Sequence, residues 1–273
     1  MADQEPGRRN ETERGEIEDL SAPRSAVVHE VVRKQGEEEL RRPNSSLFWS
    51  SAAAGIAITA SVIAEGALHH KLPADMLAKV VIADLGYTVG FLIVILGRLQ
   101  LFTEQTIVTV LPLAVQPSLH KLAETGRLWA IVFAGNLIGT CAAAAILTFC
   151  HLTSPELLAS MLDVSRSLLH KAPLDILLQG IPAGFLIASV AWLRAASSGG
   201  EFWVICTLTY AIALGDFTHV VAGATEAFLL LFAGETSLGH AFGGMILPAL
   251  IGNVIGGTGL FALLAHAQVR QEL

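Results

Sequence analysis

Asp216-Phe217-Thr218-His219 interrupts a strongly apolar stretch that runs from Leu208 to Leu231. This stretch is too long and too apolar for a surface helix, and its length is that of a membrane segment. An ionisable group at the centre of a bilayer costs about 2.5–3.5 kcal/mol even on lenient insertion scales, so such groups are rarely left there without a role. The carboxylate and the imidazole therefore predict a break in a membrane helix at residues 215–219.

A second break is predicted at residues 97–103, beside the sequence Leu101-Phe102-Thr103-Glu104. The apolar segment from 76 to 115 is longer than a bilayer core of ~30 Å requires at ~1.5 Å per residue. Each break places Phe-Thr before a titratable residue, Glu104 in one and His219 in the other. We expect the two broken segments to meet around a site at the midplane of the membrane.

Charge is distributed unevenly along the chain. Residues 1–46 hold 19 of the 41 charged side chains, and long stretches after them hold none, while 53% of the whole chain is hydrophobic. Apolar runs of this length indicate transmembrane helices. We therefore predict an all-α polytopic membrane protein with a cytoplasmic tail at 1–46, a six-helix membrane channel domain at 47–267 and a short cytoplasmic C-terminus at 268–273.

Composition and periodicity give the order of the elements. Residues 1–24 are rich in Glu, Arg, Gly and Pro, and we expect them to be disordered. Valines at helical spacing between Ser25 and Arg42 predict an amphipathic helix on the membrane surface or on the cytoplasmic face of the protein. The connection at 151–172 is expected to carry another surface helix. The six predicted membrane segments cover about residues 47–68, 76–115, 128–149, 174–195, 200–234 and 242–265.

The distribution of Lys and Arg predicts the orientation in the membrane. With the N-terminus inside, twelve of these residues fall on the cytoplasmic side, whereas only Lys71, Arg166 and Lys171 are assigned to the other side. Both termini are therefore expected in the cytoplasm. The chain is expected in a cell membrane, inner or plasma, with the lipid bilayer as a partner and no nucleic acid.

The two halves of the chain are similar to each other. Leu101-Phe102-Thr103-Glu104 corresponds to Asp216-Phe217-Thr218-His219, 115 residues later. Gly135-Asn136-Leu137-Ile138-Gly139 corresponds to Gly252-Asn253-Val254-Ile255-Gly256, 117 residues later. Three crossings per half predict an inverted 3+3 repeat with broken second and fifth helices. Half-helices that start near the two breaks would direct the positive ends of their dipoles at one point, which favours an anion.

The two Gly-Asn motifs are expected to build the scaffold and not to touch substrate. Small residues allow helices to approach closely, and an Asn between them can form an interhelical hydrogen bond. The residues concerned are Gly135, Asn136, Gly139, Gly252, Asn253 and Gly256.

His219 is the main candidate for a pore residue, because it lies in a helix break and the repeat places Glu104 opposite it. Imidazole exchanges protons in the physiological pH range. A weak-acid anion that reaches such a donor could cross apolar constrictions as the neutral acid, which avoids the cost of an unpaired ion. The alternative for His219 is a buried packing role. For Glu104, the alternative to pairing with His219 is to turn away from the pore and cap the short half-helix.

These motifs resemble those of the formate/nitrite transporter family, whose members are aquaporin-like pentameric channels for small monovalent anions. The resemblance covers about residues 26–267, and its most specific motif is the stretch Leu247-Pro248-Ala249-Leu250-Ile251-Gly252-Asn253-Val254-Ile255-Gly256-Gly257. It implies a homopentamer with one pore per subunit, for substrates such as formate, nitrite or hydrosulfide. It places the family's pore histidine on His219 and its loop threonine on Thr103. The apolar residues that narrow the pore fall approximately on Phe91, Leu101, Phe102 and Ile212.

The sequence departs from the family pattern at three points. Thr218 stands where a Glu usually precedes the histidine, and Gly184 and Gly223 stand where Asn residues are typical. Glu104 follows the Phe-Thr pair, where the family commonly has a small or neutral residue. These changes leave the expected fold intact, but they alter the charge at the centre of the pore and leave the substrate open.

We interpret the chain as a channel or proton-linked transporter for a small monovalent anion or its neutral weak acid. A pore for small neutral solutes and a non-conducting membrane scaffold or sensor are the open alternatives. No hydrolase or membrane-protease motif occurs, so we expect no enzymatic activity and no cofactor. The three cysteines lack metal-ligand spacing, so we expect no metal site.

The remaining intramembrane carboxylates belong to Glu65, Asp84 and Glu226. We expect structural roles for all three.

Overall fold

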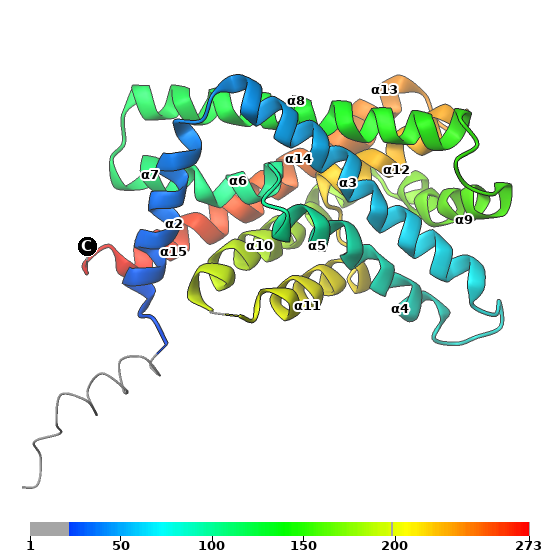
Figure 1. Cartoon of the computed structure of the whole chain (residues 1–273), viewed down its shortest axis with the longest axis horizontal. Coiled ribbons are helices and arrows are strands. Elements are labelled where there is room, and N and C mark those ends of the chain that lie inside the picture. The colour runs from blue at the N-terminus through cyan, green and yellow to red at the C-terminus, as the bar shows by residue number, and fades with distance from the viewer. Residues whose placement is uncertain (1–21, 198, 273) are drawn as a thin grey trace, which may run out of the picture.

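The computed structural model describes residues 22–197 and 199–272, and every regular element within them is helical. The disorder expected for residues 1–24 falls mainly outside this range. Within it, five helical stretches are long and apolar enough to cross a membrane. These stretches are Asn44–Lys71, Lys79–Leu96, Leu119–Phe149, Pro173–Ala196 and Leu238–Val269. They form an elongated bundle with α2 at one end and α9 at the other (Figure 1). The chain is thus an all-helical, multi-pass membrane protein.

The elements in chain order are α2 (Ser25–Leu40), α3 (Asn44–Lys71), α4 (Lys79–Ala83), η1 (Asp84–Tyr87), α5 (Thr88–Leu96), α6 (Phe102–Val108), α7 (Val110–Val115), α8 (Leu119–Phe149), α9 (Pro155–Ser165), η2 (Arg166–His170), α10 (Pro173–Ala196), α11 (Glu201–Leu214), α12 (Val220–Phe232), α13 (Leu238–His240), η3 (Ala241–Ile246), α14 (Leu247–Val254), η4 (Ile255–Ala262) and α15 (Leu263–Val269).

Helices occupy all six predicted membrane segments, with α11 and α12 together forming the fifth. The largest difference is at α8, which begins at Leu119 and not near residue 128. Ser118 caps this helix by accepting a hydrogen bond from the backbone N–H of Lys121, so a polar first turn precedes the apolar part. The amphipathic helix predicted at 25–42 and the surface helix predicted within 151–172 are α2 and α9.

Both predicted helix breaks are present. The first covers residues 97–101 and is shorter than expected, because α6 begins at Phe102; the second covers residues 215–219, as predicted. In each break the chain turns through a residue with positive φ, Arg98 at 55° and Asp216 at 52°. This left-handed conformation is uncommon for residues other than glycine, and it ends the preceding helix.

The register of the internal repeat differs from the predicted one. The N–H of Leu99 donates to Val94 O and that of Phe217 donates to Ile212 O, both at 3.0 Å, so the breaks align 118 residues apart. Leu101 therefore corresponds to His219, and the alignment of Glu104 with His219 is wrong by three residues. Two Phe-Thr pairs suggested that alignment, but they lie at different positions relative to the helix starts.

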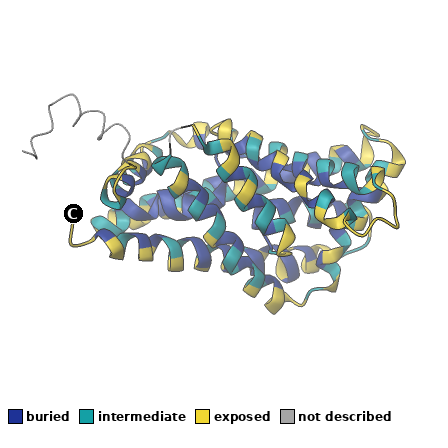
Figure 2. Cartoon of the chain, turned by 90° about the horizontal axis from the view of Figure 1, so that it is seen from below, coloured by how far each residue is buried: buried dark blue, intermediate teal, exposed yellow. Residues whose placement is uncertain are grey.

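The long helices pack in pairs that approach closely through glycines. A Cβ atom on Gly139 of α8 would lie 2.2 Å from the carbonyl oxygen of Ala52 in α3. A Cβ atom on Gly256 of η4 would lie 1.9 Å from the carbonyl oxygen of Ile181 in α10. The same glycine-mediated contact is thus made once in each half of the chain. The outward faces of the helices are the exposed ones (Figure 2). Exposed large apolar residues include Ile56, Ile93, Ile138 and Leu178.

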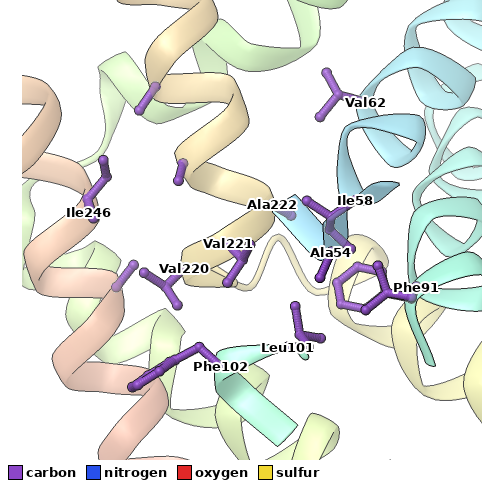
Figure 3. Packing of buried hydrophobic residues seen from close by; sticks show 14 of the residues in the cluster. Ala54, Ile58, Val62, Phe91, Leu101, Phe102, Val220, Val221, Ala222 and Ile246 are labelled. Atoms are coloured by element: carbon purple, nitrogen blue, oxygen red, sulfur yellow. The ribbon is translucent and has the colours of Figure 1, made fainter. Parts of the chain in front are cut away.

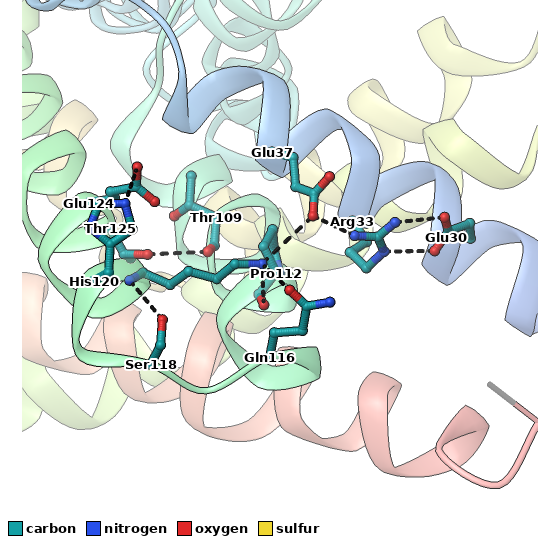
Figure 4. A network of polar contacts seen from close by, with 11 residues as sticks. Glu30, Arg33, Glu37, Thr109, Pro112, Gln116, Ser118, His120, Glu124 and Thr125 are labelled. Atoms are coloured by element: carbon teal, nitrogen blue, oxygen red, sulfur yellow. Dashed lines mark hydrogen bonds and ion pairs between the residues drawn. The ribbon is translucent and has the colours of Figure 1, made fainter.

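Helix α2 lies against the end of the bundle at which the chain finishes (Figure 1). Ser25 accepts a hydrogen bond from Gln268 at 3.0 Å, and His29 lies 3.2 Å from His266 between ring nitrogens. A second attachment involves Glu37, which pairs with Arg33 of the same helix (Figure 4). Glu37 also faces the ammonium group of Lys121 in α8, at 3.7 Å. Helix α2 is therefore fixed to both the first turn of α8 and the C-terminal helix.

The glycine contact gives a stability prediction with a control in the same helix. Gly139→Ala should lower the free energy of unfolding by about 1–3 kcal/mol, because its methyl group overlaps α3. Gly126→Ala, where no atom lies within 4 Å of the new Cβ, should be neutral or should stabilise α8 by up to about 1 kcal/mol. Thermal unfolding of the detergent-solubilised protein compares the two. Equal melting temperatures for them would contradict the packing described.

The docking of α2 should weaken in acid. His29 is fully buried beside Trp192 and His266; burial first, and then the charge of His266, lower the pKa of its imidazole. A base with a depressed pKa binds fewer protons when α2 is docked than when it is released. The contribution of His29 to the docking free energy is therefore complete above the ordinary histidine pKa of about 6.5, and it is lost as pH falls below that value. Hydrogen exchange in α2, corrected for intrinsic rates, should therefore rise on acidification. His29→Phe should flatten that dependence, whereas exposed His120→Phe should leave it unchanged.

Candidate pore at the junction of the broken helices

Two buried asparagines hold the helix breaks in shape. Asn136 Oδ1 accepts the N–H of Phe102 at 2.9 Å, and its Nδ2 donates to the carbonyls of Ser51 and Gln100 at 2.9 and 2.8 Å. Asn253 makes the same three bonds in the second half, with the N–H of Val220 and the carbonyls of Gly180 and Thr218. Each side chain thus satisfies two backbone groups that the break frees at membrane depth and ties them to a carbonyl of the neighbouring helix, α3 or α10.

The second break presents His219 to Thr103 at the first. The imidazole is 1% exposed, and its Nε2 lies 2.6 Å from Thr103 Oγ1. Its Nδ1 accepts the backbone N–H of Ala222 at 3.3 Å and caps α12. Because Nδ1 is an acceptor here, the neutral imidazole carries its proton on Nε2 and donates it to the threonine hydroxyl. Two of the predicted pore residues, His219 and Thr103, therefore meet directly.

Apolar side chains surround this contact. Phe91 meets the imidazole edge-on, with ring centroids 4.9 Å apart, and Leu101 and Ile212 are fully buried. Figure 3 shows Leu101 beside Phe91, whereas Phe102 is directed away from them. Phe102 packs instead against Trp129 and Phe133 of α8, with ring centroids 5.5 and 5.1 Å away. Phe102, one of the four predicted constriction residues, thus lies outside the junction.

Thr218 points toward the start of α10. Its hydroxyl donates to the carbonyl oxygen of Ile176 at 2.6 Å. This bond fastens the break between α11 and α12 to the start of α10.

A cavity of about 160 Å³ lies on the side of the junction that faces α2, and we call it the α2-side cavity. Its polar lining includes Glu38, Glu39, Gln100, Glu104, Gln105 and Arg194. Glu104 Oε1 accepts a hydrogen bond from Arg194 Nη1 at 2.9 Å. The proposed pairing of Glu104 with His219 is therefore wrong: α6 begins one turn earlier than that pairing requires, and its carboxylate turns to the guanidinium of α10.

A second cavity, of about 70 Å³, lies on the other side of the junction near η2, and we call it the η2-side cavity. Its lining includes Glu65, Tyr87, Lys171, Asp216, His219 and Glu226. Lys171 Nζ lies 2.8 Å from Asp216 Oδ1 and also donates to the backbone carbonyl of Asp216 at 2.8 Å. The junction is thus bounded by a polar cavity on each side.

Sequence reasoning missed Arg194, Lys171 and Tyr87 as parts of these cavities. The sequence pattern identifies Arg194 and Lys171 only as charges that orient the chain in the membrane. Their partners, Glu104 and Asp216, lie 90 and 45 residues away in the chain, so no local pattern joins them. A signal did exist for the cavities themselves, because the charges at both breaks need polar surroundings.

Comparison with known proteins agrees with this architecture. Residues 26–267 match the formate/nitrite transporter family. The inner membrane protein YfdC of Escherichia coli (strain K12) is 36% identical over 267 residues, which cover 96% of this chain and 86% of YfdC. The uncharacterized transporter YrhG of Bacillus subtilis (strain 168) is 31% identical over 191 residues, which cover 66% of this chain and 69% of YrhG.

Two solved structures share the fold. An FNT family ion channel superposes with a TM-score of 0.75 at 18% identity, covering 88% of this chain and 98% of the channel. A pentameric formate channel with formate bound superposes with a TM-score of 0.70 at 17% identity, covering 84% of this chain and 98% of the channel. Together with the match along nearly the whole sequence, these likenesses confirm the resemblance seen in the sequence motifs. The chain belongs to the formate/nitrite transporter family.

Proposed function

We propose that this protein conducts a small monovalent anion or its neutral weak acid through the junction of the two breaks, as a channel or a proton-linked transporter. The observation that carries the proposal is the contact between His219 and Thr103, which lies between two polar cavities inside an apolar wall. Formate, nitrite and hydrosulfide are the candidate substrates. The related pentameric formate channel supports this substrate class.

The apolar wall determines which species can pass. An unpaired ion that leaves water for an apolar slot loses far more solvation free energy than a neutral polar molecule does. Phe91, Leu101 and Ile212 offer no hydrogen bond that would replace water around an anion. The imidazole Nε2–H and the Thr103 hydroxyl are the polar groups that a small acid would meet there, and they can donate to its oxygen atoms. The neutral acid is therefore the species proposed to cross the junction.

The assembly and orientation proposed here follow the family. We infer a homopentamer in the inner or plasma membrane, with a pore in each subunit and the two halves inserted as inverted repeats. The α2-side cavity would then face the cytoplasm, together with both termini. The proximity of α2 to α15 supports placing both ends of the chain on one side of the membrane.

A pore for small neutral solutes is the second candidate, and a specific ion pair favours it. Glu104 neutralises Arg194 in the α2-side cavity, so that this guanidinium attracts anions less strongly than a free cation would. A channel of this kind would conduct neutral molecules without any dependence on pH.

Flux into liposomes separates these candidates. Purified protein should accelerate the uptake of formate, nitrite, acetate or hydrosulfide, with a rate that rises as the external pH falls. His219→Ala should lower uptake at every pH, because it removes the Nε2–H donor beside Thr103, whereas exposed His240→Ala should keep the native rate. Uptake of a neutral solute without uptake of any weak acid would favour the second candidate. If neither weak acids nor neutral solutes are taken up, the remaining hypothesis is the non-conducting membrane scaffold or sensor.

The pair formed by Glu104 and Arg194 gives a prediction for anion flux. Glu104→Gln should raise weak-acid anion flux at neutral pH by about fivefold, because one free charge at 4 Å in water attracts an anion by about 1 kcal/mol. The double variant Glu104→Gln/Arg194→Gln should return the flux to the native level, since it removes both charges. The measurement is initial formate uptake into liposomes. Formate uptake by Glu104→Gln at or below the native rate would contradict the neutralising role of Glu104.

A further inference from the structure

The η2-side cavity holds acidic groups that the description of the junction leaves without a role. Glu65 is 9% exposed and Tyr87 is 7% exposed, and both line the cavity together with the partly buried Glu226. Among the described residues, no hydrogen bond or ion pair reaches either carboxyl group, and the hydrogen bonds of Tyr87 are made by its backbone. Three oxygen-bearing side chains from α3, η1 and α12 therefore line one cavity beside His219.

The charged groups around this cavity are mostly acidic. Glu226, Asp84 and Asp216 repel a negative charge on Glu65. A negative charge on Glu226 is attracted by Lys171 and repelled by Asp216. The ammonium group of Lys171 is bound to Asp216, as the two 2.8 Å contacts indicate. Within the described part of the chain, no second Lys or Arg lines the cavity. A free anion therefore meets two carboxyl groups here with no unpaired cation beside them.

Two neighbouring carboxyl groups without a partner cation are costly to ionise together in a confined cavity. The form that avoids this cost carries at least one proton, and a carboxylic acid donates where a carboxylate only accepts. The cavity volume of about 70 Å³ is several times the roughly 10–15 Å³ that one water requires, so a small anion can enter with water. Proton donors thus line the approach to the apolar wall.

We propose that Glu65 and Glu226 form a proton-donor site that converts the anion of a small weak acid into the neutral acid before it reaches His219. This inference rests on the proposed function and replaces the structural role expected for both residues. The carboxyl O–H bond breaks, a new bond forms between that proton and the oxygen or sulfur of the anion, and a carboxylate remains. A hydronium ion in the water that enters the cavity then returns a proton to the carboxylate and becomes water. Tyr87 supplies a hydroxyl that can donate to the anion during the transfer.

The test is formate uptake into liposomes against external pH, with Glu65→Gln/Glu226→Gln and the two single variants. At about pH 7 the formate uptake rate of the double variant should be at least about tenfold below that of the native protein. The reason is that positioned proton donors contribute ~10²–10⁴-fold to the rates of other proton transfers. At about pH 4, where water already supplies protonated formic acid, it should match the native protein. Agreement at low pH also shows that the variant folds. Glu65→Asp should keep part of the flux at pH 7.

Glu156→Gln is the matched control, since Glu156 is an exposed carboxylate at the start of α9, outside the cavity. It should leave the whole pH profile unchanged. A double variant that retains native flux at pH 7, or that loses flux equally at both pH values, would overturn the donor role. Methylammonium uptake tests for a cation site instead. If the native protein takes up methylammonium and the double variant does not, the two carboxyl groups form a cation site and the proton-donor role is overturned. Absence of weak-acid flux in the native protein would instead reject the proposed function, and this inference with it.

Discussion

The structure depends on the satisfaction of backbone hydrogen bonds at two helix breaks inside the membrane. Asn136 and Asn253 each bind one N–H and two carbonyls of a broken segment and its neighbouring helix. Without such partners, unsatisfied peptide groups at that depth would cost several kcal/mol each. The glycines around each asparagine let the helices come close enough for these bonds to form. Packing and polar satisfaction are therefore inseparable here, and both recur in the two halves of the chain.

This constraint positions the chemistry of the junction. The second Asn fixes the start of α12, which places His219 at its cap with Nε2 directed to Thr103. The matching position in the first half is Leu101, so the repeat supplies an imidazole on one side and an apolar side chain on the other. Charges are kept to the flanking cavities, where Glu104 binds Arg194 and Asp216 binds Lys171. An apolar centre between polar cavities favours species that can lose their charge on the way.

Much of this arrangement could be predicted from the sequence, because it follows from local patterns. Charges within apolar runs indicated the breaks, and the repeated Gly-Asn motif indicated the scaffold. The register of the repeat could not be found that way, since the start of α6 depends on Asn136, 34 residues further along the chain. The similarity of two Phe-Thr pairs was misleading for the same reason. The partner of Glu104 and the lining of the η2-side cavity also arise from contacts between distant helices, which no single segment encodes.

The central claim is that a neutral molecule crosses the apolar wall beside His219. The most direct test measures formate and proton movement together in liposomes while the membrane potential is varied with potassium and valinomycin. If the claim is correct, protons will enter with formate in equal number, and the rate will follow the pH gradient but not the membrane potential. Formate flux that the membrane potential drives without proton uptake would show that the bare anion passes, and it would contradict this account.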